Sequence, residues 1–318
     1  MPRYLVTGCA GFIPSTLVDA LLAEGSEVVG VDSFSDYYAR EPKEKAIASA
    51  RSDPGFTLIE HDLAAGVPAE ALAGVQGIFH LAGRPGVRAS WGASFRGYVN
   101  DNVLATHRVV EAALERGVRL VYASSSSIYG DALAYPTPED TPPAPVSPYG
   151  VTKLACEHLV AAHGKNAGLD FAVLRYFSVY GPRQRPDMAF SRMIDALVEG
   201  RTFEVYGDGQ QSRDFTYVDD AVSATAAAMS SAPSGSIYNV GGGSEATVRE
   251  AVAAIQELSD RRLDVAYGEP AAGDVRRTLA DTSRIRAEVG WEPRVGLREG
   301  LAAMLDAAGL RTRAVQSR

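Results

Sequence analysis

The first half of this 318-residue chain alternates short apolar runs with longer stretches of helical periodicity. Near-continuous apolar runs are typical of strands buried on both faces, and their alternation with helices indicates a parallel sheet covered on both sides. We therefore predict an α/β fold built on a doubly wound parallel sheet. The predicted strands are 3–7, 27–31, 77–82, 119–123 and 170–176, and the predicted helices are 15–24, 99–116 and 151–162.

The pattern changes after about residue 178, where loops rich in proline, arginine and glycine separate shorter elements. A chain of this length exceeds the usual size of one compact domain, so we divide it into 1–177 and a smaller region, 178–318. Within that region, 190–199 and 217–229 are predicted helices, and we expect the segment of about 214–240 to return to the first part. We expect the tail beyond Leu310 to fray.

The composition argues against several classes of protein. With 31 basic and 39 acidic residues, the net charge of −8 is unfavourable for nonspecific nucleic-acid binding, although local basic patches stay open. No apolar run is long enough for a membrane span, and the N-terminus enters a strand pattern without a basic leader. Cys9 and Cys156 cannot build a disulfide framework, and the histidines form no ligand cluster. We expect a cytoplasmic protein without a catalytic metal.

The segment between the first predicted strand and helix reads T-G-C-A-G-F-I-P. Gly8 permits a tight turn, and Gly11 lets the backbone approach a pyrophosphate that would sit on the helix N-terminus. The expected donors are the backbone N–H groups of Phe12 and Ile13. Pro14 takes the place of a third glycine, but proline fits the first turn of a helix, where its missing N–H has no partner to lose.

An acidic residue follows the second predicted strand. Asp32 lies where a ribose-binding carboxylate belongs in a dinucleotide fold, and an acid there favours NAD over NADP. The alternative is an ordinary strand–helix turn with a solvated acid beside it.

A tyrosine and a lysine are four residues apart in the segment Y-G-V-T-K. Tyr149 and Lys153 would share one helix face, and a nearby ammonium lowers the pKa of a phenol, so Tyr149 is a candidate general base. Upstream, the serines of 124–127 end a predicted strand, where ligands bind in such sheets. The alternative is a surface Tyr/Lys pair and a polar loop.

Taken together, these motifs resemble the extended short-chain dehydrogenase/reductases of the nucleotide-sugar epimerase and dehydratase group. The likeness covers nearly all of the chain. It includes T-G-C-A-G-F-I (7–13), H-D-L (61–63), H-L-A-G (80–83), S-S-S-S-I-Y-G (124–130), S-P-Y-G-V-T-K (147–153), V-Y-G-P-R (179–183) and R-D-F-T-Y-V-D-D (213–220).

The resemblance implies a Rossmann-type NAD-binding domain in 1–177 and a nucleotide-sugar-binding region in 178–318. It implies a homodimer, since the helices equivalent to 99–116 and 151–162 form a dimer bundle in related enzymes. It also implies roles for single residues. In catalysis, Tyr149 would be the base and Ser125 would bridge the substrate and Tyr149. In NAD binding, Lys153 would hold the nicotinamide ribose, Asp32 would bind the adenosine ribose, and Asp62 and Leu63 would flank the adenine. In binding of the nucleotide sugar, Val205 and Tyr206 would lie near the nucleotide base, and Arg213 and Arg276 would bind phosphate.

The positions after Ser125 help to choose among the reactions of the group. The 4,6-dehydratases have an Asp and a Glu where this chain has Ser126 and Ser127, and UDP-glucuronate decarboxylases have a Glu at the position of Ser127. Without these acids, neither elimination nor decarboxylation is favoured. The reaction that remains is 4-epimerisation.

Further segments resemble UDP-glucuronate 4-epimerases. Residues 181–189 are similar to their W-G-R-P-D-M-A stretch, and 82–88 to A-Q-A-G-V-R, which brings in Arg88. Ser178 replaces the Asn typical of UDP-glucose 4-epimerases. Because hydroxyls and a guanidinium suit a carboxylate, Ser126, Ser127, Ser178 and Arg185 are the candidate ligands for glucuronate.

We therefore expect conversion of UDP-glucuronic acid to UDP-galacturonic acid through a transient 4-keto intermediate, with the carboxylate retained and NAD left unchanged overall. The main alternative is a UDP-glucose or other UDP-hexose 4-epimerase. A UDP-glucuronate decarboxylase and a non-catalytic NAD-binding protein are further alternatives.

Overall fold

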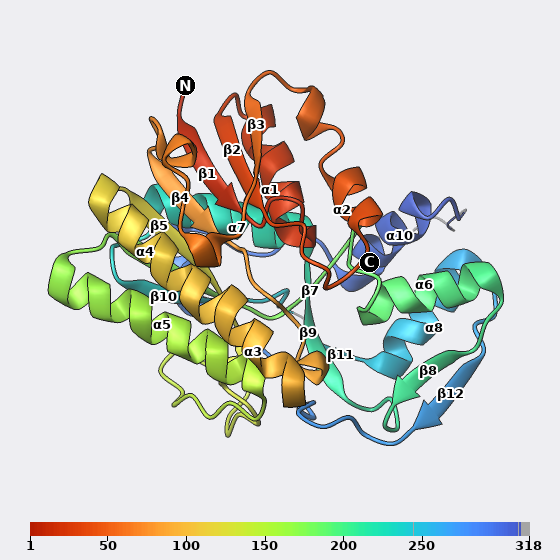
Figure 1. Ribbon diagram of the computed structural model, residues 1–318. Helices are drawn as coiled ribbons and strands as arrows, with labels where there is room; N and C mark the ends of the chain where they lie inside the picture. The colour runs from red at the N-terminus through yellow and green to blue at the C-terminus, as the bar shows by residue number, and fades with distance from the viewer. Residues whose placement is uncertain (244, 311, 313–318) are drawn as a thin grey trace.

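The computed structural model describes residues 1–243, 245–310 and 312, so most of the tail beyond Leu310 lies outside the described residues. Seven parallel strands form one sheet in the order β3-β2-β1-β4-β5-β6-β10 (Figure 1). The prediction of a doubly wound parallel sheet is confirmed. The strands are β1 (Arg3–Thr7), β2 (Glu27–Asp32), β3 (Phe56–Glu60), β4 (Gly77–His80), β5 (Arg119–Ser125), β6 (Phe171–Tyr176) and β10 (Ser236–Val240).

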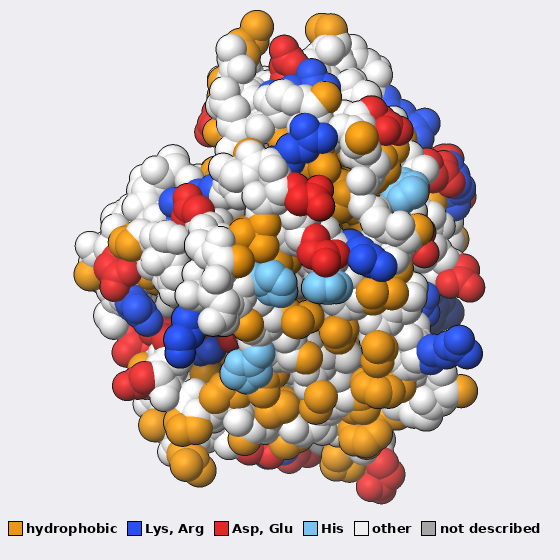
Figure 2. All heavy atoms as spheres, turned by 60° about the vertical axis from the view of Figure 1, so that its left-hand side comes forward, with side chains coloured by type: hydrophobic (Ala, Val, Ile, Leu, Met, Phe, Trp, Pro, Cys, Tyr) orange, Lys and Arg blue, Asp and Glu red, His pale blue; other side chains and the backbone are white. Residues whose placement is uncertain are grey.

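Helices cover both faces of this sheet, which explains the near-continuous apolar strands. Neighbouring residues of one strand enter different cores: Val6 packs on one side and Leu5 on the other. On the side of Val6, α1 (Phe12–Ala23) packs against α7 (Val218–Ser231), and the side of Leu5 is covered by α4 (Ala105–Arg116) and α5 (Pro148–Ala167). Figure 2 shows the molecule from that second side, where hydrophobic side chains and histidines gather.

The predicted helix 99–116 is continuous but begins with a π-helical turn. The structure has a short α-helix, α3 (Phe95–Tyr98), followed by a π-helical turn over Val99–Leu104, and α4 begins only at Ala105. Apolar periodicity does not distinguish hydrogen bonding to residue i−4 from bonding to residue i−5, so the sequence could not indicate this turn. π-helical turns occur frequently at functional sites, and this one contains the buried Asn102.

The smaller region follows β6. Its three-stranded sheet has the order β11-β9-β7, and a two-stranded sheet pairs β12 with β8. After β9 the chain passes through α7 and adds β10 to the edge of the large sheet. Among the described residues, no helix combines the length and the apolar character needed to cross a bilayer. The elements are α2 (Arg40–Ala46), β7 (Ser178–Tyr180), α6 (Ala189–Glu199), β8 (Phe203–Tyr206), β9 (Ser212–Tyr217), β11 (Glu245–Thr247), α8 (Val248–Ser259), β12 (Val265–Gly268), α9 (Ser283–Val289) and α10 (Leu297–Ala307).

A buried ion pair fixes α5 against the sheet. Arg175 on β6 donates through Nη2 to Glu157 on α5 at 2.8 Å, and both side chains are about nine-tenths buried or more. Glu157 also accepts from Ser124 at the end of β5, and Nη1 of Arg175 donates to Tyr129 at 2.7 Å. The register of α5 along β5 and β6 is therefore held by charged and hydroxyl groups as well as by apolar packing.

Candidate active site

A cavity of about 690 Å³ lies at the carboxyl ends of the central strands. This is the edge where ligands bind in open parallel sheets, beside the point at which the strand order reverses, here between β1 and β4. Predicted residues from both halves of the site line it. These are Gly8, Gly11, Phe12, Ile13, Asp32, Asp62, Leu63, Ser125, Ser126, Ser127, Tyr149, Lys153, Ser178 and Arg185.

The turn after β1 depends on the absence of a side chain at Gly8. This residue has φ +69°, and its N–H donates to the carbonyl of Val31 at 2.7 Å. A Cβ at Gly8 would lie 2.8 Å from the Cα of Ala82, so the turn lies directly against the segment that follows β4. Glycine therefore permits both the positive φ and the close approach to Ala82, and Gly8 lines the cavity together with Gly11 and the first residues of α1.

The start of α1 accommodates Pro14. Gly11 is the residue before the first helical position, and the first regular helical bond runs from the N–H of Ser15 to the carbonyl of Gly11 at 3.0 Å. Pro14 precedes Ser15 and so breaks no helical bond. Phe12 and Ile13 occupy the first two helical positions, where a backbone N–H has no partner within the helix.

Asp32 is anchored by the backbone on both oxygens. It accepts from the N–H of Ala10 at 3.0 Å and from that of Phe34 at 2.8 Å. Burial raises the pKa of its carboxyl, and the two backbone bonds oppose that rise. At the next strand, Asp62 accepts from the N–H of Ala64 at 2.9 Å and caps a short turn that begins at Leu63.

Ser125, Tyr149 and Lys153 share the cavity, but Lys153 does not point its charge at Tyr149. Its Nζ donates to the carbonyl of Ala123 at 2.7 Å and lies 3.3 Å from Oη of Tyr122. Burial raises the pKa of Tyr149, while Ser125 and then Arg185 oppose the rise. Lys153 is thus held against β5, and its lowering of the pKa of Tyr149 stays a prediction.

The serines predicted to contact a sugar form one wall. Ser125 donates to Oγ of Ser127 at 3.1 Å and accepts from the N–H of Ser127 at 3.1 Å. Ser126, Ser127 and Ser178 also line a second cavity of about 170 Å³, which contains Arg213, so the serine wall connects the two spaces.

The four predicted arginines differ in their partners. Arg213 donates to the carbonyl of Ser212 at 2.8 Å, and burial lowers the pKa of its guanidinium. Arg185 is paired with Asp187 at 3.0 Å. Outside the lining of both cavities, Arg88 pairs with Asp274, and Arg276 pairs with Asp208 at 2.9 Å.

Val205 and Tyr206 lie outside the lining of both cavities. The side chain of Val205 is buried in the larger core. Tyr206 is partly exposed and lies beneath Arg88, whose guanidinium carbon is 4.0 Å from the centre of its ring.

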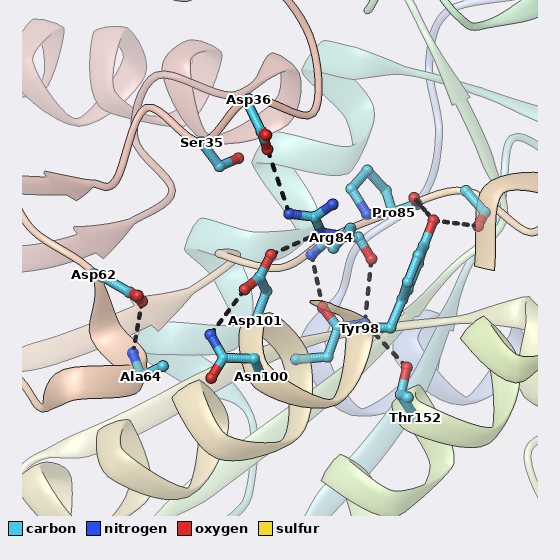
Figure 3. A network of polar contacts seen from close by, with 12 residues as sticks. Ser35, Asp36, Asp62, Ala64, Arg84, Pro85, Tyr98, Asn100, Asp101 and Thr152 are labelled. Atoms are coloured by element: carbon cyan, nitrogen blue, oxygen red, sulfur yellow. Dashed lines mark hydrogen bonds and ion pairs between the residues drawn. The ribbon is translucent and has the colours of Figure 1, made fainter. Parts of the chain in front are cut away.

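Sequence reasoning did not single out Arg84. Its backbone is clamped by Asn102, which accepts from the N–H of Arg84 at 2.6 Å and donates to its carbonyl at 3.1 Å (Figure 3). Asn102 also donates to Thr152 on α5 at 3.0 Å, while Tyr98 donates to the carbonyl of Pro85 at 2.7 Å. The available signal was an arginine directly after H-L-A-G, at the end of a predicted strand.

The fold and the cavity define a dinucleotide-dependent enzyme of the short-chain dehydrogenase/reductase type. The residues fit NAD, because a side chain is excluded at Gly8 and Asp32 offers a fixed carboxylate at the adjacent strand end. Residues 4–241 match the model of the NAD dependent epimerase/dehydratase family. The chain belongs to this family, which confirms the prediction of an NAD-dependent enzyme of the nucleotide-sugar epimerase group.

Individual relatives have different sugars in their names. UDP-glucuronic acid 4-epimerase from Bacillus cereus, solved with UDP-glucuronic acid and NAD, is 37% identical with a TM-score of 0.93, over 96% of this chain and 99% of that chain. MoeE5, solved with UDP-glucuronic acid and NAD, is 42% identical with a TM-score of 0.87 over the same shares. UDP-glucose 4-epimerase of Mycolicibacterium smegmatis is 39% identical, over 96% of this chain and 97% of the relative.

We expect Pro14→Gly to leave the affinity for NAD unchanged within about two-fold, because the proline removes no donor that the helix or a phosphate uses. Fluorescence titration of the purified variant with NADH measures this. If only the glycine variant bound the cofactor, the proposed role of the α1 N-terminus would be wrong.

Proposed function

We propose that this protein converts UDP-glucuronic acid to UDP-galacturonic acid with NAD and retains the carboxylate. One observation carries the proposal. The wall shared with Ser125 and Tyr149 presents the hydroxyls of Ser126, Ser127 and Ser178, and the guanidinium of Arg185 lines the same cavity. Such groups bind carboxylate oxygens, whereas an Asp or a Glu at 126 or 127 would repel them.

The proton transfers would be carried out by the chain's own side chains. Tyr149 would take the proton of the 4-hydroxyl and later return it, with Ser125 hydrogen-bonded between the sugar and the phenol. Bound NAD would supply the hydride acceptor and donor at C4. Lys153, whose Nζ donates to the carbonyl of Ala123 at 2.7 Å, would bind a hydroxyl of the nicotinamide ribose.

Retention of the carboxylate is the difficult part of this reaction. The 4-keto form of glucuronate is a β-keto acid, which loses CO2 when the C5–C6 bond lines up with the carbonyl π system. Hydrogen bonds from Ser126, Ser127 and Ser178 would hold the carboxylate away from that alignment. Arg185 would neutralise its charge if it exchanged Asp187 for the substrate.

The diphosphate of the UDP group has a candidate site in the second cavity. Arg213 lies there, and the contacts recorded for it among the described residues are to the backbone carbonyls of Ser212 and Arg276. Since burial disfavours its charged form, an anion placed there would relieve that cost. Arg88 and Arg276 would first have to leave Asp274 and Asp208.

We expect the purified protein to form UDP-galacturonic acid from UDP-glucuronic acid, and Tyr149→Phe to abolish turnover while NAD stays bound. Chromatographic separation of the UDP-sugars after incubation with each substrate measures this. Formation of UDP-galactose from UDP-glucose with UDP-glucuronate untouched would support the hexose epimerase instead. A UDP-pentose product would indicate decarboxylation. Unchanged turnover in Tyr149→Phe would contradict the assignment of Tyr149 as the base.

We expect Arg185→Gln to raise KM for UDP-glucuronate by roughly ten-fold or more, because a charge-assisted contact to the carboxylate is lost. Any activity toward UDP-glucose should change little. Arg183→Gln is the matched control, since Arg183 lies two residues away on the same loop and pairs with Asp19 at 2.7 Å. Equal losses for both sugars, or for both variants, would contradict the assignment.

A homodimer and a cytoplasmic location form part of the same proposal. Val151 on α5 and Val99 and Leu104 in the π-helical turn before α4 are exposed. Figure 2 shows hydrophobic side chains gathered on the side of these helices. Contiguous exposed apolar surface indicates a protein contact. We expect sedimentation equilibrium to give twice the chain mass and Val151→Glu to shift the protein toward monomer; a monomeric wild type would contradict this.

A further inference from the structure

Arg84 lines the cofactor cavity, and nothing in the proposed reaction uses it. Its side chain is only 22% exposed, and Nε donates to Asp101 at 2.8 Å (Figure 3). At its outer end, Nη2 lies 3.7 Å from Asp36, beyond hydrogen-bond distance, and Asp36 is 97% exposed. Because solvent screens this long and exposed ion pair, the pair contributes little to stability.

The side chain of Arg84 runs between the two ends of the predicted cofactor site. A Cβ at the preceding Gly83 would lie 3.8 Å from Nζ of Lys153, which marks the nicotinamide end. The other end is marked by Asp32 at the end of β2, and Nη2 of Arg84 lies 3.7 Å from Asp36, four residues further along that loop. The part of a dinucleotide between its two nucleosides is the diphosphate.

Two features hold the guanidinium in this position. Asn102 clamps both backbone groups of Arg84 and is itself tied to Thr152 on α5. Asp101 holds Nε and faces the same cavity, so the outer nitrogens are directed away from the helix and toward the Asp36 side. The protein therefore positions a cation in advance, which lowers the entropic cost of binding an anion there.

We propose that Arg84 binds the diphosphate of NAD, as a second contact beside the N-terminus of α1, and that the loose pairing of Nη2 with Asp36 gives way when the cofactor arrives. Two phosphate charges exceed what one helix terminus offers, and a guanidinium matches phosphate oxygens in a forked arrangement. This inference rests on NAD binding and not on the identity of the sugar.

The test uses the full chain freed of bound nucleotide, with NADH fluorescence as the probe and ADP and adenosine as competitors. We expect Arg84→Gln to raise the Kd for NADH by roughly ten-fold or more. Displacement by ADP, which retains the diphosphate, should weaken similarly, whereas displacement by adenosine should be unchanged. Arg84→Lys should recover part of the loss. A similar loss for adenosine would show a structural effect and overturn the proposal, as would unchanged binding of NADH.

Two further variants distinguish phosphate binding by Arg84 from an indirect effect of the Arg84–Asp36 ion pair on the cofactor. If Asp36 only occupies Arg84 before binding, Asp36→Asn leaves the Kd for NADH unchanged or lowers it; a rise like that of Arg84→Gln would mean that the ion pair itself retains the cofactor. Arg40→Gln is the matched control, because Arg40 pairs with Glu60 at 2.7 Å and does not line the cavity. It should not change cofactor affinity.

The readouts of this proposal and of the proposed function are independent. Binding of NADH, ADP and adenosine needs no sugar nucleotide, so a different substrate would leave the expected pattern intact. Conversely, epimerisation of UDP-glucuronate with unchanged NADH affinity in Arg84→Gln would reject the role of Arg84 alone.

Discussion

The site depends on a close approach of two backbone segments at the carboxyl edge of the sheet. The turn at Gly8 lies against Ala82, so closely that a side chain at Gly8 could not fit. This approach occurs at β1 and β4, where the strand order reverses, and both segments line the cavity. It directs the α1 N-terminus toward the cofactor and, two residues beyond Ala82, places Arg84 along the same wall.

Burial then determines the charge state of the groups around this edge. Burial lowers the pKa of Lys153 and raises those of Tyr149 and Asp32, so in each case the charged form is disfavoured. The chain offsets part of this cost with backbone groups: the carbonyl of Ala123 for Lys153, and two N–H groups for Asp32. Burial thus raises the pKa of Tyr149, while the hydrogen bond of Ser125 and the charge of Arg185 oppose that rise.

What the sequence could predict was mostly local. The strand–helix alternation indicated the sheet. The glycine turn and the Y-x-x-x-K spacing indicated the edge of the sheet at which the cofactor binds, because each motif spans only a few consecutive residues. Pairings between distant segments could not be read in this way: Arg88 with Asp274 and Arg276 with Asp208 link residues on different loops. Neither could the burial of Val205, which depends on how β8 packs, nor the π-helical turn that places Asn102 against Arg84.

The same distinction between local and distant contacts applies to function. Relatives named for different sugars match nearly the whole of this chain, so the shared fold cannot by itself select among those sugars. In the proposed function, selection would fall to side chains that come from separate elements and line one cavity: Ser126 and Ser127 after β5, Ser178 on β7 and Arg185 on the following loop. Each contributes one polar group, and a carboxylate at any of these positions would reverse the local charge. In the proposed function, single substitutions at these positions would change the substrate and leave the fold and the cofactor site as they are.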